Sequence, residues 1–159
     1  VVIKGPKGAV QVALHPRVKV VKQDQTLLVS VVDPAVKLDR SLWGLFGSLL
    51  KNAVEGVTKG FEKRLELVGV GFKAAVKGQE LSLEVGFSHP VNFKIPEGIT
   101  VTVDKEGVKV SGIDKGLVGE TAASIRALKK PEPYKGTGIK YSGEKIRRKA
   151  GKTATKAAT

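Results

Sequence analysis

The first third of the chain alternates apolar and polar positions with a period of two. The alternation is clear over residues 10–14 and 18–20, and it is typical of half-buried strands. Apolar segments at 1–4 and 26–32 complete a set of four predicted strands, and turn residues separate one from the next. Because the connections are too short for crossovers, we expect these strands to pair antiparallel.

The hydrophobic pattern then changes period. Over residues 42–57, apolar side chains recur at the i, i+3, i+4, i+7 spacing of a helix that buries one face. Asp39 or Ser41 is suited to cap the start of this helix, and Gly60 is suited to end it. The apolar stripe is expected to pack across the preceding sheet. Trp43 fits a packing role there better than a base-stacking one.

The second half of the chain follows a similar order of elements. We expect a long strand over 62–76 and a hairpin turn at 77–80 that leads into a strand over 81–87. Three shorter strands (91–95, 100–103 and 108–111) and a helix over 117–130 follow. Cations gather at the end of that helix, where they complement the helix dipole.

An internal repeat links the two halves. Residues 1–10 resemble residues 108–118 with one residue inserted, since each segment runs from a strand through a turn of glycines and lysine. The sequence therefore predicts an α+β protein of two tandem duplicated domains, each a small antiparallel β-sheet packed by one α-helix. We place the boundary near Ala75, which gives domains 1–75 and 76–159, the second with a basic C-terminal extension from about residue 131.

The charge is concentrated at the C-terminal end. The chain of 159 residues carries a net charge of +13. Residues 126–159 hold eleven Lys or Arg against two acids, a net +9. Such an asymmetry favours a polyanionic partner. The alternative is a solvated basic tail without a partner, but a bare tail needs no ordered Pro-Tyr-Gly segment leading into it.

The candidate RNA-binding side chains are the cations and tyrosines of this region. Lys and Arg neutralise phosphates, and Arg can also bridge two phosphate oxygens. Gly136 and Gly138 are expected to let the backbone approach a phosphate closely. The two tyrosines can either stack on bases or pack the segment against the second domain, and both roles stay open. The candidates are Arg126, Lys129, Lys130, Tyr134, Lys135, Lys140, Tyr141, Lys145, Arg147, Arg148, Lys149 and Lys152.

Catalytic chemistry has little support in the sequence. The chain has no cysteine, which excludes disulfides and thiolate zinc sites. Its two histidines, His15 and His89, each precede a proline and fit turns better than catalysis, and no HExxH, Walker or dinucleotide motif is present. No apolar run is long enough to span a membrane. We expect no enzyme activity, cofactor, metal or small-molecule substrate, and a cytoplasmic protein.

Several ordered sequence blocks carry a family resemblance. They are KGPKG (4–8), VTKGF (57–61), LVGVGFKA (67–74), GFSHP (86–90) and PEPYKGTGIKYSGEKIRRK (131–149). In this order they resemble the bacterial-type large-subunit ribosomal protein L6 family. The family's opening strand segment has no counterpart, so an N-terminal segment is expected to be missing. Residues 153–159 match nothing in the family. We expect residues beyond about 151 to be mobile in the free protein and to become ordered only along RNA.

The resemblance implies a more specific function. It implies a structural constituent of the large subunit of the cytoplasmic ribosome, which binds 23S-type rRNA near the sarcin–ricin region through the second domain and tail. Neighbouring ribosomal proteins would be partners, and the first domain would lie towards the docking site of translational GTPases. The alternative is a basic module for membrane surfaces or acidic proteins. It is disfavoured because the cationic segment lacks an apolar helical face.

Overall fold

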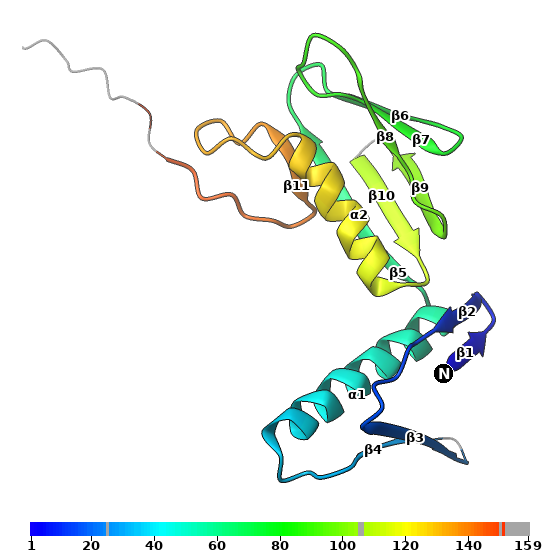
Figure 1. The fold of residues 1–159 in the computed structure, drawn as a ribbon. Coiled ribbons are helices and arrows are strands. Elements are labelled where there is room, and N and C mark those ends of the chain that lie inside the picture. The colour runs from blue at the N-terminus through cyan, green and yellow to red at the C-terminus, as the bar shows by residue number, and fades with distance from the viewer. Residues whose placement is uncertain (25, 105–106, 150, 152–159) are drawn as a thin grey trace, which may run out of the picture. The chain divides into compact units, whose positions relative to one another are not determined.

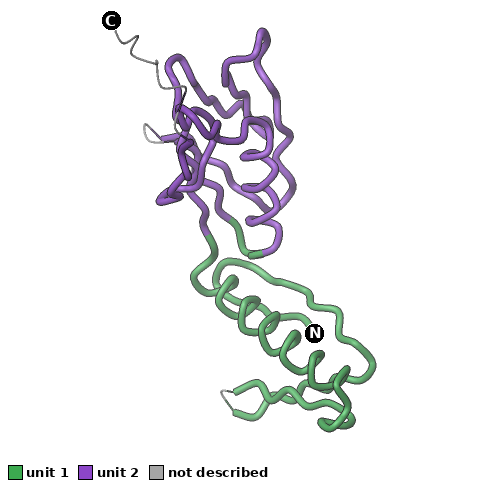
Figure 2. Tube along the Cα trace, turned by 90° about the vertical axis from the view of Figure 1, so that its left-hand side faces the viewer, with its two compact units in different colours: residues 1–61, 112–115 green, residues 62–111, 116–159 purple. Residues whose placement is uncertain are grey.

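The computed structural model describes residues 1–24, 26–104, 107–149 and 151. It confirms the α+β class, with helices and small antiparallel sheets. Two compact units are present: the first is Val1–Phe61 with Gly112–Lys115, and the second is Glu62–Ser111 with the chain from Gly116 onward (Figure 2). The expected boundary near Ala75 therefore falls inside the second unit. That the two units arose by duplication stays a prediction.

The first unit is built from two β-hairpins and one helix. Strands β1 (Val2–Gly5) and β2 (Gly8–Gln11) form one hairpin, and strands β3 (Val18–Gln23) and β4 (Thr26–Val31) form the other (Figure 1). Helix α1 (Lys37–Thr58) contacts strands of both. The expected antiparallel pairing is confirmed, but the four strands form two separate hairpins and not one continuous sheet.

Helix α1 follows the predicted apolar stripe. Phe46, Leu50, Ala53 and Val57 are buried at helical spacing. Gly60 ends the helix as predicted: it has a φ of +80° and its N–H donates to the carbonyl of Glu55 at 3.2 Å. This stripe is what fixes the helix on the two hairpins.

The predicted cap at the start of α1 was wrong. The helix begins earlier, and Val36 precedes it without a side-chain cap. Asp39 lies buried inside the first turn, where its carboxylate accepts hydrogen bonds from Arg17 Nη1 at 2.9 Å and from the Asp33 N–H at 3.0 Å. Trp43 is half-exposed, and its Nε1–H donates to the carbonyl of Val29 at 3.0 Å, which ties the helix to β4.

Asp39→Ala is expected to lower the free energy of unfolding by about 1–3 kcal/mol, because the Arg17 guanidinium and the Asp33 N–H lose their buried acceptor. Ser41→Ala is the matched control, since Ser41 is exposed and should change stability by no more than about 0.5 kcal/mol. Urea unfolding of both variants measures the difference. Equal losses would contradict the role that the structure gives to Asp39.

The second unit holds two sheets and helix α2 (Lys115–Leu128). Four strands, β5 (Phe61–Val68), β9 (Ile99–Asp104), β10 (Gly107–Gly112) and β11 (Gly138–Tyr141), form a sheet in the order β11-β5-β10-β9. Strands β6 (Lys73–Lys77), β7 (Glu80–Glu84) and β8 (Val91–Lys94) form the other sheet. Figure 1 shows α2 across one face of the four-stranded sheet, and the core lies between them.

The single strand predicted over 62–76 was also wrong. The chain breaks at residues 69–72, and its two parts, β5 and β6, enter different sheets. Gly71 has a φ of +78°, which turns the chain, and a Cβ on Gly69 would lie 2.9 Å from the ring of Phe72. Both glycines therefore serve a turn and not a continuous strand.

Strand β11 was not predicted. It pairs antiparallel with β5, with Ile139 opposite Leu67, and the Ile139 side chain is fully buried. The Ile139 N–H donates to the carbonyl of Lys129 at 2.8 Å, which joins the strand to the end of α2. The basic C-terminal extension is thus partly built into the sheet of the second unit.

Candidate nucleic-acid interface

The chain doubles back after β11. A turn at Ser142–Gly143 closes with a hydrogen bond from the Glu144 N–H to the carbonyl of Tyr141 at 3.0 Å. The returning segment 145–149 then meets the loop 131–137, where the Lys149 N–H donates to the carbonyl of Pro133 at 2.8 Å. The end of α2, the loop and the returning segment are therefore neighbours in the second unit, and each of them carries cations.

Seven of the twelve candidate side chains are exposed. They are Lys130, Tyr134, Lys135, Lys145, Arg147, Arg148 and Lys149. We call the six cations among them the basic cluster. Within the described part of the chain, none of these six lies in an ion pair with an acid. The basic cluster thus has the charge and the exposure that a polyanion requires.

Four other candidates have partners within the protein. Arg126 donates to Glu144 through Nε at 3.1 Å and through Nη2 at 2.5 Å, and Lys140 Nζ lies 2.7 Å from Glu66 Oε2. Lys129 Nζ lies 4.6 Å from the ring centroid of Phe87. The half-buried ring of Tyr141 faces Arg126 at 5.6 Å and a lysine of β5, Lys63, at 5.9 Å. These contacts hold the scaffold under the basic cluster. Lys152 and residues 153–159 lie outside the described residues.

Two glycines of the segment face the protein itself. A Cβ on Gly138 would lie 2.7 Å from Pro131 Cα, and this glycine has a φ of +147°. Gly136 is buried, and a Cβ there would lie 3.4 Å from the guanidinium nitrogens of Arg148. The expectation that their backbone lies open to a phosphate is therefore not met, because the chain's own atoms cover both positions.

Glu144 is the acid that organises the turn. The hydrogen bonds from Arg126 and then from the Tyr141 N–H hold the pKa of Glu144 below its ordinary value. The same pairing raises the pKa of Arg126. The carboxylate is therefore charged, and the pair is intact, at neutral pH.

Acid is expected to weaken this part of the fold. Because the folded pKa of Glu144 lies below the unfolded one, its contribution to stability is complete above pH 4.5 and is lost as the pH falls through the folded pKa. Thermal melts between pH 7 and pH 3 should therefore show a shallower acid slope in Glu144→Gln than in the wild type. Parallel slopes would mean that the ion pair does not form in solution.

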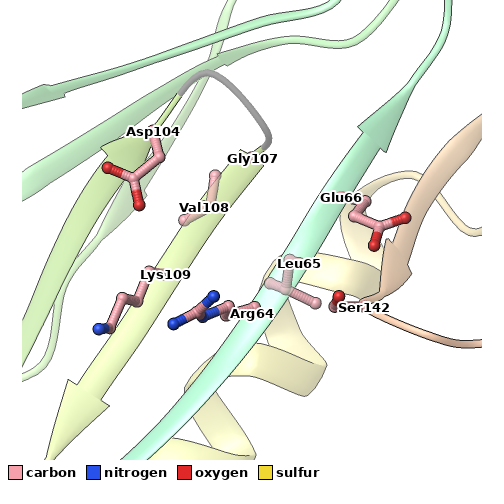
Figure 3. A pocket seen from close by; sticks show the side chains of 8 residues that line it. All are labelled: Arg64, Leu65, Glu66, Asp104, Gly107, Val108, Lys109 and Ser142. Carbon is pink, nitrogen blue, oxygen red and sulfur yellow. The ribbon is translucent and has the colours of Figure 1, made fainter.

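The sheet face opposite α2 has a different character. A cavity of about 380 Å³ opens there between β5 and β10, and Figure 3 shows Arg64 and Lys109 extending from these neighbouring strands. Glu62 pairs with Lys109 at 2.7 Å and with Arg64 at 3.3 Å, so cations and acids neutralise one another. This balanced surface contrasts with the basic cluster.

Both histidines of the chain lie at exposed positions. No group of three or more His, Cys, Asp or Glu that could hold a metal ion is found in the part of the chain that the structure describes. His15 is exposed and accepts a hydrogen bond from the backbone N–H of Arg17 at 3.2 Å, and His89 lies beside Ser88 at 3.4 Å. No helix among the described residues is long and apolar enough to cross a membrane.

The fold and the basic cluster define a two-unit α+β binding protein with a cationic surface on its second unit. The family model described as ribosomal protein L6 matches residues 68–142. Over 156 residues the chain is 53% identical to the large ribosomal subunit protein uL6 of Solidesulfovibrio magneticus, which covers 98% of this chain and 87% of that relative. The chain therefore belongs to the ribosomal protein L6 family.

Other relatives agree over nearly the whole chain. The protein of the same name from Chlamydia felis is 52% identical over 155 residues, which covers 97% of this chain and 85% of that relative. The one from Picosynechococcus is 48% identical over 158 residues, with 98% and 87% covered. The similarity thus extends across both units and beyond the residues that the family model matches.

Proposed function

We propose that this protein is a structural constituent of the large ribosomal subunit and binds 23S-type rRNA through its second unit. One observation carries the RNA-binding part: six exposed cations gather without acidic partners, while other cations of the same unit are paired with Glu62, Glu66 and Glu144. The names of its relatives, large ribosomal subunit proteins, support the assembly.

The contacts would be made mainly to phosphates. Lys and Arg of the basic cluster would neutralise phosphates of the RNA backbone. Binding of this kind depends on the salt concentration and does not by itself distinguish one base sequence from another. Structured RNA is recognised largely by shape and backbone, so a rigid cationic surface suits it. Tyr134 is exposed beside Lys135 and can stack on an unpaired base. Tyr141 is held between cations within the unit, which favours an anchoring role.

The finer placement rests on the family resemblance. We propose that the second unit binds near the sarcin–ricin region of the rRNA, beside neighbouring ribosomal proteins. The first unit would then lie towards the docking site of translational GTPases. Both units would take these positions in the assembled ribosome, and neither would have a catalytic role there.

Co-sedimentation tests the assembly. The protein should travel with large ribosomal subunits through a high-salt sucrose gradient, and free protein at the top of the gradient would overturn the proposal. Competition tests the partner: an rRNA fragment should displace labelled RNA at far lower concentration than vesicles of an anionic lipid. The reverse order would favour a membrane-surface role.

A further inference from the structure

Arg126 and Glu144 form an ion pair just before residues 145–149, and we call this pair the clamp. The guanidinium donates to both carboxylate oxygens, at 3.1 Å and 2.5 Å, and the side chains are only 27% and 25% exposed. Glu144 Oε2 also accepts the N–H of Tyr141 at 3.0 Å, while the Tyr141 carbonyl accepts the N–H of Glu144 at 3.0 Å. One carboxylate thus connects the last turn of α2, the end of β11 and the turn that follows.

The clamp lies directly before four members of the basic cluster. Lys145 follows Glu144 in the chain, and Arg147, Arg148 and Lys149 come next. Residues 145–149 contain no helix or strand. In the described structure, two polar attachments hold this segment to the rest of the unit: the clamp at its start, and the bond from the Lys149 N–H to the carbonyl of Pro133 at its end.

We propose that Arg126 and Glu144 are positioning residues, whose ion pair holds residues 145–149 in their RNA-binding arrangement before the RNA arrives. This inference rests on the proposed rRNA binding. A segment without regular structure loses conformational entropy when a ligand fixes it, and holding it beforehand moves that loss from binding to folding. A bidentate pair of arginine with a carboxylate is suited to this, because it fixes direction as well as distance. Arg126 then acts through Glu144 and not on a phosphate.

Glu144→Gln separates positioning from direct contact, because the two roles predict opposite signs. The substitution removes an acid and frees Arg126, so if Arg126 bound phosphate the variant would bind an rRNA fragment more tightly. With the clamp as proposed, binding weakens despite the added positive charge. If the segment then keeps its arrangement a tenth of the time, the dissociation constant rises about tenfold.

A double-mutant cycle adds a second test. Arg126→Gln, Glu144→Gln and the double variant should weaken RNA binding by similar factors, because each opens the same ion pair. The slope of log K against log salt should stay unchanged in all three. A further loss in the double variant, with a flatter slope, would show that Arg126 contacts phosphate and would overturn the positioning role.

Hydrogen exchange of the free protein tests, without RNA, whether the clamp orders residues 145–149. In Glu144→Gln the amide of Lys149 should exchange several-fold faster, while amides of β10 keep their protection. Glu62→Gln is the matched control, since it also removes one acid from ion pairs, but its partners are Lys109 and Arg64, and it should leave Lys149 unchanged. Unchanged exchange at Lys149 in Glu144→Gln would overturn the inference.

The two proposals fail in different ways. If wild-type protein does not bind the rRNA fragment, the proposed function fails, although exchange can still show that the clamp orders the segment. If the wild type binds and Glu144→Gln binds as tightly or more tightly, the proposed function stands and the positioning role is overturned.

Discussion

Replacing Lys145, Arg147, Arg148 and Lys149 together by Gln is expected to weaken binding to an rRNA fragment most strongly at low salt. These side chains are exposed and belong to the basic cluster, so each phosphate that they neutralise releases condensed counterions. The plot of log K against log salt should flatten by about 0.7–0.9 for each phosphate that is no longer neutralised. The fold should persist, because exposed charge changes usually alter stability by no more than about 0.5 kcal/mol each.

The first unit offers a control with the same charge change. Lys19, Lys22, Lys37 and Lys51 are exposed there, and none of them is in an ion pair among the described residues. Changing these four to Gln removes four charges as well, but should leave the salt slope almost unchanged. If both variants flatten the slope equally, binding follows net charge, and the basic cluster has no special part in it.

The parts of the fold that sequence predicted are those with a strong local signal. Helix α1 carries a long apolar stripe and ends at a glycine in the left-handed region, and both features are visible in the residues themselves. The turn at Gly78 between β6 and β7 is another such signal. The break at residues 69–72 was missed because apolar residues continue through it.

Strand β11 shows what local patterns leave out. It has four residues and one aliphatic side chain, Ile139, in a region where cations and glycines dominate. No periodicity can develop over so short a segment. The strand exists because β5, which is distant in the sequence, offers it an edge to pair with, and because Ile139 becomes buried in the second unit.

The candidate site, too, was predictable from the sequence only in part. Composition identifies which residues are cations, but the long-range partners decide which of them remain available to a ligand. Lys140 meets Glu66 on the neighbouring strand β5, and Arg126 meets Glu144 from the helix. The charge pattern cannot distinguish these two cations from Lys145 or Lys149, because every one of them lies in the same basic stretch.

Ile139→Ala is expected to lower the free energy of unfolding of the second unit by about 2–5 kcal/mol, the usual cost of emptying a buried aliphatic position. RNA binding should also weaken, because the turn that carries Glu144 starts from the end of β11. Urea unfolding and RNA titration of the same variant measure the two effects.

The neighbouring residue provides the comparison. Lys140 carries its side chain to Glu66 and not into the core, so Lys140→Gln should change stability by less than about 1 kcal/mol. If β11 supports the basic cluster, Ile139→Ala weakens RNA binding because the cluster is less well ordered. The slope of log K against log salt stays unaltered, since no cation has been removed. If stability is unchanged in Ile139→Ala, β11 is not packed under α2 in solution, and the basic cluster has no fixed base on the sheet.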